Sequence, residues 1–132
     1  MFKLLKIENA RMNVPEPEFL EAKAGEEIAL GEALVLSGGV LTKCSATVAP
    51  AFVAMGIKSA GDANRALPVC RVERNQVWEV PITAAPTELK VGDKVTVHTD
   101  GLQVTATTTS GVVSVVSLNG ASAAGDKIVV RI

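Results

Sequence analysis

The stretch Lys94-Val-Thr-Val-His-Thr-Asp-Gly-Leu-Gln-Val-Thr-Ala106 decides the fold class. Apolar and polar residues alternate on both sides of Asp100-Gly101, as they do in strands that bury one face. Asp-Gly is among the strongest short signals for a β-hairpin, because glycine accepts the positive φ that such turns need. The stretch therefore predicts two antiparallel strands, over residues 94–98 and 102–106.

Similar segments follow one another through most of the chain, and Gly38-Gly39 predicts a second hairpin. Short apolar segments bounded by turn residues occur at 27–30, 33–36, 41–44, 52–57, 66–72, 76–82, 111–118 and 127–132. No window shows the apolar period of 3.6 residues that marks an amphipathic helix. We expect an all-β fold of about seven to nine short strands, arranged as a small β-barrel or a sandwich.

Residues 1–23 are predicted to form an extended N-terminal arm, which leaves residues 24–132 as a single β domain. The segment Asn13-Val-Pro-Glu-Pro-Glu18 carries Pro15 and Pro17. Each proline fixes φ and lacks a backbone donor, and the residue before it is pushed toward an extended conformation. Neither a helix nor a central strand fits this segment.

The predicted arm also carries apolar residues, namely Met12, Val14, Phe19 and Leu20. Two interpretations stay open for it. It can be a terminus that packs on its own domain, or an arm that docks on a neighbouring protein. The apolar side chains favour docking, because a purely solvated tail has no need of them.

A glycine followed by an acid recurs at four predicted turns. These turns are Ala24-Gly-Glu26, Ala60-Gly-Asp62, Val91-Gly-Asp93 and Ala124-Gly-Asp126. Glycine supplies a positive φ, and the acid can accept backbone N–H groups before the next strand begins. A calcium site would need several oxygen ligands that converge in one loop, whereas these acids come one to a turn. We therefore expect a role in turn formation.

The composition excludes several classes of protein. The chain has 132 residues, of which 48% are hydrophobic and 20% charged, so it is not a disordered chain. Its formal net charge is −1, which leaves no basic excess for binding nucleic acid. Aromatic residues make up only 3%, so few rings are available to stack on a ligand. Trp78 is expected to pack either in the core or between subunits.

The residues that carry chemistry are few. His98 is the single histidine, and it falls on the polar side of its strand. Cys44 and Cys70 lack the close spacing of zinc ligands; we expect two unpaired core thiols, with one disulfide between them as the alternative. The sequence contains neither a G-x-S-x-G elbow nor a phosphate-binding glycine loop. We expect no enzyme activity, no metal and no cofactor.

The first seven residues are too short an apolar stretch for a secretion signal, since Glu8, Asn9 and Arg11 interrupt it. No run approaches the roughly 18 apolar residues that would span a bilayer. We expect a protein that is made in a cytoplasm and has no membrane partner.

The order of segments along nearly the whole chain carries a resemblance. These segments are Ala10-Arg-Met-Asn-Val-Pro-Glu-Pro17, Gly31-Glu-Ala-Leu-Val-Leu-Ser-Gly-Gly-Val-Leu-Thr42, Val91-Gly-Asp-Lys-Val95, Asp100-Gly-Leu-Gln-Val104, Ser110-Gly-Val-Val113 and Gly125-Asp-Lys-Ile-Val-Val-Arg-Ile132. In this order the chain resembles the small capsid-decoration (head-stabilising, cement) proteins of tailed phages and prophages.

The resemblance implies a non-enzymatic structural protein on the outer capsid surface of a virion. Its β-rich body would form a homo-oligomer, with a trimer favoured, and its arm would lie over the major capsid protein. The residues that the resemblance assigns to the capsid contact are Met12, Val14, Pro15, Pro17, Phe19 and Leu20. A second hypothesis is a β-barrel ligand-binding or accessory module of a tail or cell-surface assembly. The scarcity of aromatic residues argues against a sugar as its ligand.

Overall fold

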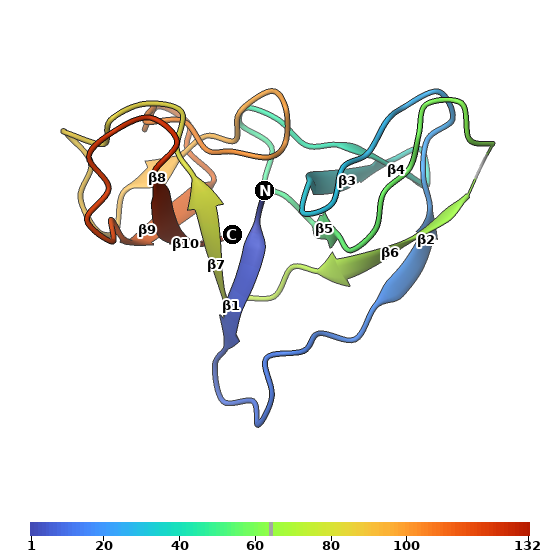
Figure 1. Ribbon diagram of the computed structural model, residues 1–132, viewed down its shortest axis with the longest axis horizontal. Coiled ribbons are helices and arrows are strands. Elements are labelled where there is room, and N and C mark those ends of the chain that lie inside the picture. Colours follow the sequence, from blue (N-terminus) through green and yellow to red (C-terminus); the bar gives the residue numbers. More distant parts are fainter. Residues whose placement is uncertain (64) are drawn as a thin grey trace.

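The computed structural model describes residues 1–63 and 65–132, in which ten β-strands and their connections make up the fold (Figure 1). The strands are β1 (Lys3–Ile7), β2 (Glu18–Glu21), β3 (Ala33–Ser37), β4 (Val40–Lys43), β5 (Phe52–Ala54), β6 (Ala66–Arg71), β7 (Gln76–Pro81), β8 (Lys94–Val95), β9 (Val113–Ser117) and β10 (Lys127–Arg131). Among the described residues there is no helix long and apolar enough to cross a membrane.

The strands form two antiparallel sheets of five strands each. Sheet A has the order β1-β7-β10-β9-β8, and sheet B has the order β2-β6-β5-β3-β4. In Figure 1 sheet A lies on the left and sheet B on the right, with β1 between them. The all-β prediction is confirmed and the arrangement is sandwich-like, but the sheets are not closed into the barrel that was the other expectation.

The buried side chains form two apolar clusters, of which the larger joins the two sheets. The larger cluster packs Trp78 and Val130 of sheet A against Ala33, Val53 and Cys70 of sheet B. The smaller cluster lies against sheet B alone, where Ile28 of the β2–β3 connection covers Leu34, Phe52 and Leu67. Val, Leu, Ile and Ala make up most of both clusters, as the scarcity of aromatic residues requires.

The predicted N-terminal arm needs a correction. Residues 3–7 form β1, which pairs with β7 in sheet A, and residues 18–21 form β2, which pairs with β6 in sheet B. Phe2 and Ala22, which flank these strands, are buried in the two apolar clusters. The segment therefore gives one strand to each sheet, and only residues 8–17 stand apart from the body. Pairing with strands more than 45 residues away, which a local pattern does not reveal, produces this outcome.

The predicted hairpins form, with shorter strands than expected. Ser37 pairs with Val40 around Gly38-Gly39, and both glycines have positive φ (61° and 84°). In the opening stretch Val97 pairs with Val104 and the His98 N–H donates to the Gln103 carbonyl at 2.9 Å. Only Lys94–Val95 of that hairpin, which is β8, forms a regular strand.

The strand count differs from the predicted seven to nine. Residues 27–30 contribute one isolated bridge, from Ile28 to Lys58, rather than a strand. The two strands inside the predicted arm raise the total to ten.

The predicted role of the acids is confirmed at three of the four glycine–acid turns. Each acid donates its own N–H to the carbonyl three residues earlier, which closes a turn. In three of the four turns the carboxylate also accepts a backbone N–H from the turn: Ser59 to Asp62 at 3.1 Å, Lys90 to Asp93 at 2.8 Å, and Ala123 to Asp126 at 2.9 Å. Gly25, Gly92 and Gly125 have positive φ as expected, whereas Gly61 is not among the positive-φ glycines.

A fifth turn of this kind, Ala29-Leu-Gly-Glu32, joins the two sheets. The Phe2 N–H, at the start of β1, donates to the Gly31 carbonyl at 2.8 Å. The Gly31 N–H donates in turn to the Ala54 carbonyl, at the end of β5, at 2.8 Å. Gly31 has φ +72°, and a Cβ there would lie 2.8 Å from the Phe2 carbonyl oxygen. No other residue type fits this position without a shift of the backbone.

We expect Gly31→Ala to destabilise the fold by about 3 kcal/mol or more, because strain at positive φ adds to a backbone clash. Gly25→Ala is the matched control. Gly25 has a similar φ of +75°, but a Cβ there would meet nothing within 4 Å. The control should lose only about 1 kcal/mol. Urea unfolding measures both free energies, and equal losses would show that the close approach at Gly31 does not matter.

Candidate interaction site

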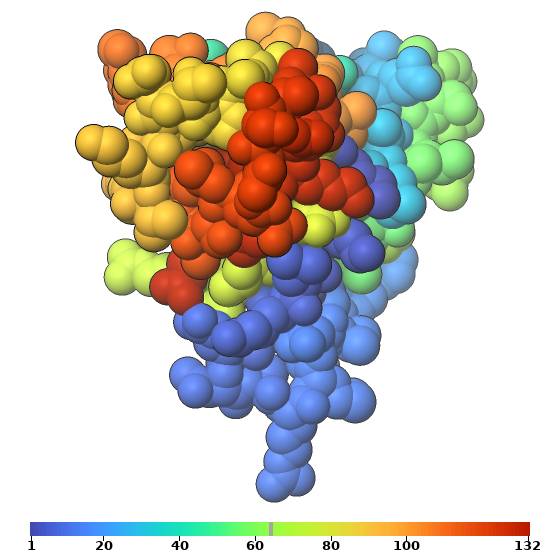
Figure 2. All heavy atoms as spheres, turned by 60° about the vertical axis from the view of Figure 1, so that its left-hand side comes forward, coloured from blue at the N-terminus to red at the C-terminus, as the bar shows by residue number. Residues whose placement is uncertain are grey.

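The connection between β1 and β2, residues 8–17, projects from the body of the molecule and is called the β1–β2 loop below. Figure 2 shows this blue segment below the rest of the surface. Its base is held by side chains: the Asn13 Oδ1 accepts the Ile7 N–H at 2.9 Å, and the Glu8 carboxylate accepts a hydrogen bond from Arg131 at 2.6 Å. Pro15 and Pro17 stiffen the return toward β2.

The loop presents apolar side chains to solvent. Met12 and Val14 are 71% and 72% exposed, and Phe19, on β2, is 66% exposed. Pro17 is exposed as well. An exposed single apolar residue is ordinary, but two of them on one stiffened projection form a ready contact for another surface. Four of the six residues that the sequence assigned to a contact are therefore accessible.

The other two residues of that set lie differently. Leu20 pairs with Leu67 across β2 and β6 and packs against the smaller apolar cluster, so it belongs to the fold rather than to a contact. Pro15 is half-buried and lines a groove beside the loop. β-Strand alternation explains the correction at Leu20, because Phe19 and Leu20 must point to opposite faces of the sheet.

The structure places Trp78 in the core. Its side chain is 2% exposed and belongs to the larger apolar cluster. It lies on β7, which β1 and β10 flank on both sides. Of the two interpretations that the sequence left open, core packing within one chain is the one that the structure supports.

A groove of about 280 Å³ lies between β1, the end of β5 and the β1–β2 loop. Leu4 and Trp78 line it from sheet A, Val53 and Met55 from the side of sheet B, and Pro15 from the loop. Lys3 is the one charged residue among the described residues that line it. The groove is thus mainly apolar, and it adjoins the loop that carries Met12 and Val14.

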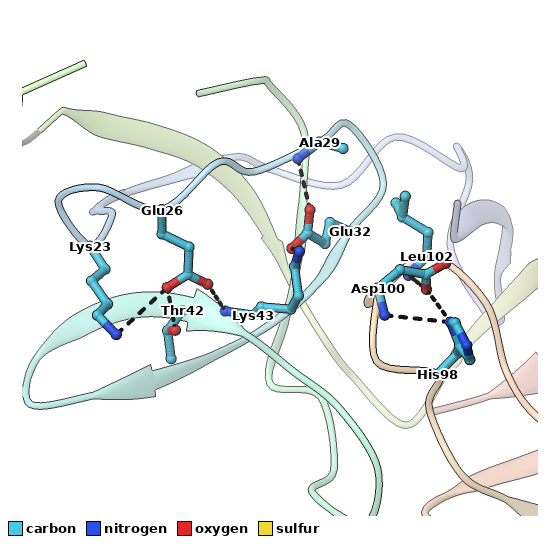
Figure 3. A network of polar contacts seen from close by, with 9 residues as sticks. All are labelled: Lys23, Glu26, Ala29, Glu32, Thr42, Lys43, His98, Asp100 and Leu102. Carbon is cyan, nitrogen blue, oxygen red and sulfur yellow. Dashed lines mark hydrogen bonds and ion pairs between the residues drawn. The ribbon is translucent and has the colours of Figure 1, made fainter. Parts of the chain in front are cut away.

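A polar network lies around the β3–β4 hairpin (Figure 3). The Glu26 carboxylate accepts hydrogen bonds from the Thr42 hydroxyl and the Lys43 N–H, both at 2.6 Å. It also forms an ion pair with Lys23 at 3.9 Å. Glu26 therefore ties the β2–β3 connection to β4, which is a structural use of the acid in the first glycine–acid turn.

Glu32 is the buried member of this network. Its Oε2 accepts the Ala29 N–H at 2.8 Å, and its Oε1 faces the Lys43 ammonium at 3.5 Å. Its side chain is only 2% exposed, and Oε1 has no hydrogen-bond partner among the described residues. Burial raises the pKa of Glu32, and the Ala29 N–H and the Lys43 ammonium offset only part of that rise.

His98 and Asp100 form the remaining part of Figure 3. The His98 Nδ1 lies 3.1 Å from the Asp100 carboxylate, which also accepts the Leu102 N–H at 2.8 Å. Burial raises the pKa of Asp100, but hydrogen bonds from Gln103, Leu102 and His98 outweigh it and hold this pKa below its ordinary value. These bonds order the Asp-Gly turn. No serine, threonine or cysteine of the described residues donates a hydrogen bond to His98.

The two thiols are free and buried. Burial raises the pKa of Cys44 to about 11, and its Sγ lies 3.0 Å from the Val48 carbonyl oxygen. Burial also raises the pKa of Cys70, which packs in the larger cluster next to the groove. Thiols of this kind are poor nucleophiles, because the thiolate is the reactive form.

Within the described parts of the chain, no group of three or more His, Cys, Asp or Glu side chains is placed to hold a metal ion. The arrangement that does stand out is a stiffened loop with two exposed apolar side chains, and an apolar groove beside it. Such a surface suits contact with another protein.

Sequence reasoning missed two features of this region. Gly31 and Glu32 repeat the glycine–acid pattern of the four recognised turns, so the string Leu30-Gly31-Glu32 was the signal that could have found them. The groove gave no signal, because residues from six separate segments of the chain line it.

Comparison of the chain with models of protein families and with curated proteins finds no match.

Both thiols should resist modification in the folded protein. We expect Cys44 and Cys70 to react with Ellman's reagent slower by roughly a hundredfold or more in buffer than in denaturant, because reaction must wait for local opening. The increase in absorbance as the reagent is cleaved measures both rates, and Cys44→Ala and Cys70→Ala assign each thiol. A rapid reaction of either thiol in buffer would contradict its burial.

Replacement of Glu32 should change how stability depends on pH. The folded-state pKa of Glu32 is raised, so its stabilising contribution is present below the unfolded-state pKa and is lost as pH rises through the folded-state value. The difference in free energy of unfolding between Glu32→Gln and the parent chain should therefore favour the variant more at pH 7 than at pH 4. Chemical unfolding at the two pH values measures the difference. Glu88→Gln, at an exposed carboxylate, controls for the loss of one charge.

Proposed function

We propose that the chain is a non-enzymatic structural protein that decorates the outside of a phage or prophage head. Its partner is the major capsid protein, which it contacts through the β1–β2 loop. The homotrimeric state and the location on the outer capsid surface follow from the resemblance to capsid-decoration proteins. The two-sheet body is the rigid part, and the contact stabilises the shell.

One observation carries the contact: Met12 and Val14 are more than two-thirds exposed on a loop stiffened by prolines and held at its base. Burying an exposed apolar side chain of this size on a partner is worth about 1.5–3 kcal/mol. The two prolines lower the entropy that the loop loses on binding, since they limit its conformations beforehand. The loop is therefore suited to bind without refolding.

A repeated shell surface strengthens such a contact. Each copy has only a small projecting site, but an oligomer that engages several equivalent sites binds with an effective concentration that multiplies the affinity. Modest individual contacts are sufficient under this arrangement. The low net charge of −1 fits a surface that other copies and the shell cover.

The test uses point substitutions, because β1 and β2 belong to the sheets and deletion of the first 20 residues would remove β1 and most of β2. We expect Met12→Asp combined with Val14→Asp to weaken binding by roughly a hundredfold or more, since a charge replaces each buried apolar group. Binding is measured by sedimentation with shells assembled from the capsid protein of the phage or prophage that encodes the chain.

Val91→Asp is the matched control for that experiment. Val91 is 68% exposed, which is close to the 72% of Val14, but it lies in the turn before β8 in sheet A. Neither variant should shift the free energy of unfolding by more than about 0.5 kcal/mol, because all three side chains face solvent. Unchanged shell binding by the loop variant would remove the contact from the proposal. If the protein is strictly monomeric and does not bind capsid shells, the proposed decoration function is wrong.

The alternative, a ligand-binding or accessory module of a tail or cell-surface assembly, draws support from the groove. Its volume of about 280 Å³ is at the lower end for small-molecule sites. A module of this kind would bind its ligand without shells and would be insensitive to the Met12 and Val14 substitutions, so the same variants separate the two functions.

A further inference from the structure

The open edge of β1 is a second surface with binding potential, distinct from the tip of the β1–β2 loop. β1 is the first strand in the order of sheet A, and it pairs with β7 alone among the described strands. At one end its edge is occupied where the Phe2 N–H meets Gly31, and at the other where the Ile7 N–H meets Asn13. The edge between these points, residues 3–6, carries no such bond to another strand.

The apolar groove runs beside this edge. Leu4, on the edge strand, lines it together with Trp78 behind it and Met55 across it. Leu30 and Met55 on its rim are 48% and 37% exposed. An unpaired edge supplies main-chain donors and acceptors, and an adjacent apolar groove supplies a place for the side chains of an added strand, which is the geometry of β-augmentation.

Charge limits what can occupy the groove. Lys3 is the one charged residue in the described lining, and no carboxylate lines it. Lys6 and Lys3 both lie on the edge strand, and lysines on an edge disfavour pairing with a strand of like charge. An incoming strand that places a carboxylate near Lys3 would instead gain from the contact.

We propose that the β1 edge and its groove bind a short extended segment of another protein, in which apolar side chains alternate with a carboxylate. The segment adds to sheet A next to β1, its apolar side chains enter the groove, and its carboxylate pairs with Lys3. This binding goes beyond the shell contact of the loop tip, because it does not use Met12 or Val14.

A second copy of this chain is the poorer occupant. Its most exposed extended segment is the β1–β2 loop, where Met12 and Val14 could supply apolar groups. Pro15 and Pro17 follow directly, however, and each lacks the N–H that a strand needs in order to pair. Another protein's unbroken segment meets the requirement better.

Trp78 gives a direct assay. It is the single tryptophan of the chain and lines the groove, so its fluorescence reports on occupancy. The probe is an acetylated and amidated hexapeptide of alternating Val and Asp, titrated into the free protein. The comparison probe alternates Val and Lys. We expect saturable binding of the Asp peptide and binding at least roughly tenfold weaker for the Lys peptide.

Charge substitution tests the role of Lys3. Lys3→Glu should reverse the preference between the two peptides, and Lys3→Gln should remove most of that preference. The Lys3→Gln variant provides the test if the charge reversal in Lys3→Glu affects folding. Lys94→Glu is the matched control, because Lys94 is an exposed lysine on β8, at the opposite edge of sheet A. The control should keep the preference of the parent chain.

Leu30→Asp tests the groove itself and should weaken binding of the Asp peptide by roughly tenfold or more, because a carboxylate on the rim repels it. Leu36→Asp is the control, since Leu36 is 47% exposed at the end of β3 but does not line the groove. Absence of saturable binding, or equal binding of both peptides, would overturn the proposal. The proposal would also be overturned if light scattering showed that the fluorescence change coincides with self-association of the chain. The experiment contains no shells, so its failure is separate from a failure of the decoration function.

Discussion

Two hydrogen bonds at Gly31 set the relation between the sheets. Its carbonyl receives the Phe2 N–H from the start of β1, and its N–H donates to the Ala54 carbonyl at the end of β5, both at 2.8 Å. The chain can pass between sheet A and sheet B this closely only where no side chain intervenes. Because buried backbone groups must be paired, these bonds fix β1 beside sheet B.

That join places the proposed binding surfaces at the edge of the molecule. Once Phe2 is bonded to Gly31, β1 runs along sheet A with one edge on β7 and the other facing the groove. The chain then leaves β1 and must return to begin β2 in sheet B, so the connection between them projects from the body (Figure 1). The prolines suit this path because the connection makes few main-chain bonds. The loop and the groove are thus two consequences of one topology.

The glycine–acid turns show why some local features were predictable. In these turns the acid accepts the N–H of a residue three positions earlier, so every group involved lies within four residues. Glu32 follows the same local rule, yet its burial and its raised pKa depend on Lys43 and on packing around the β3–β4 hairpin. Likewise the sequence left open whether Trp78 packs in the core or between subunits, because the residues that bury it come from distant segments of both sheets.

By itself the sequence determined the all-β class and the hairpins at Gly38-Gly39 and Asp100-Gly101. Each of these depends on residues that are neighbours in the chain. Only the tertiary structure decided that residues 1–23 divide into two strands in different sheets, that Leu20 faces inward, and that a groove lies beside β1. Those outcomes depend on pairings such as Lys3 with Glu79 and Phe19 with Pro68, and alternation along a strand predicts a buried face without naming the partner strand.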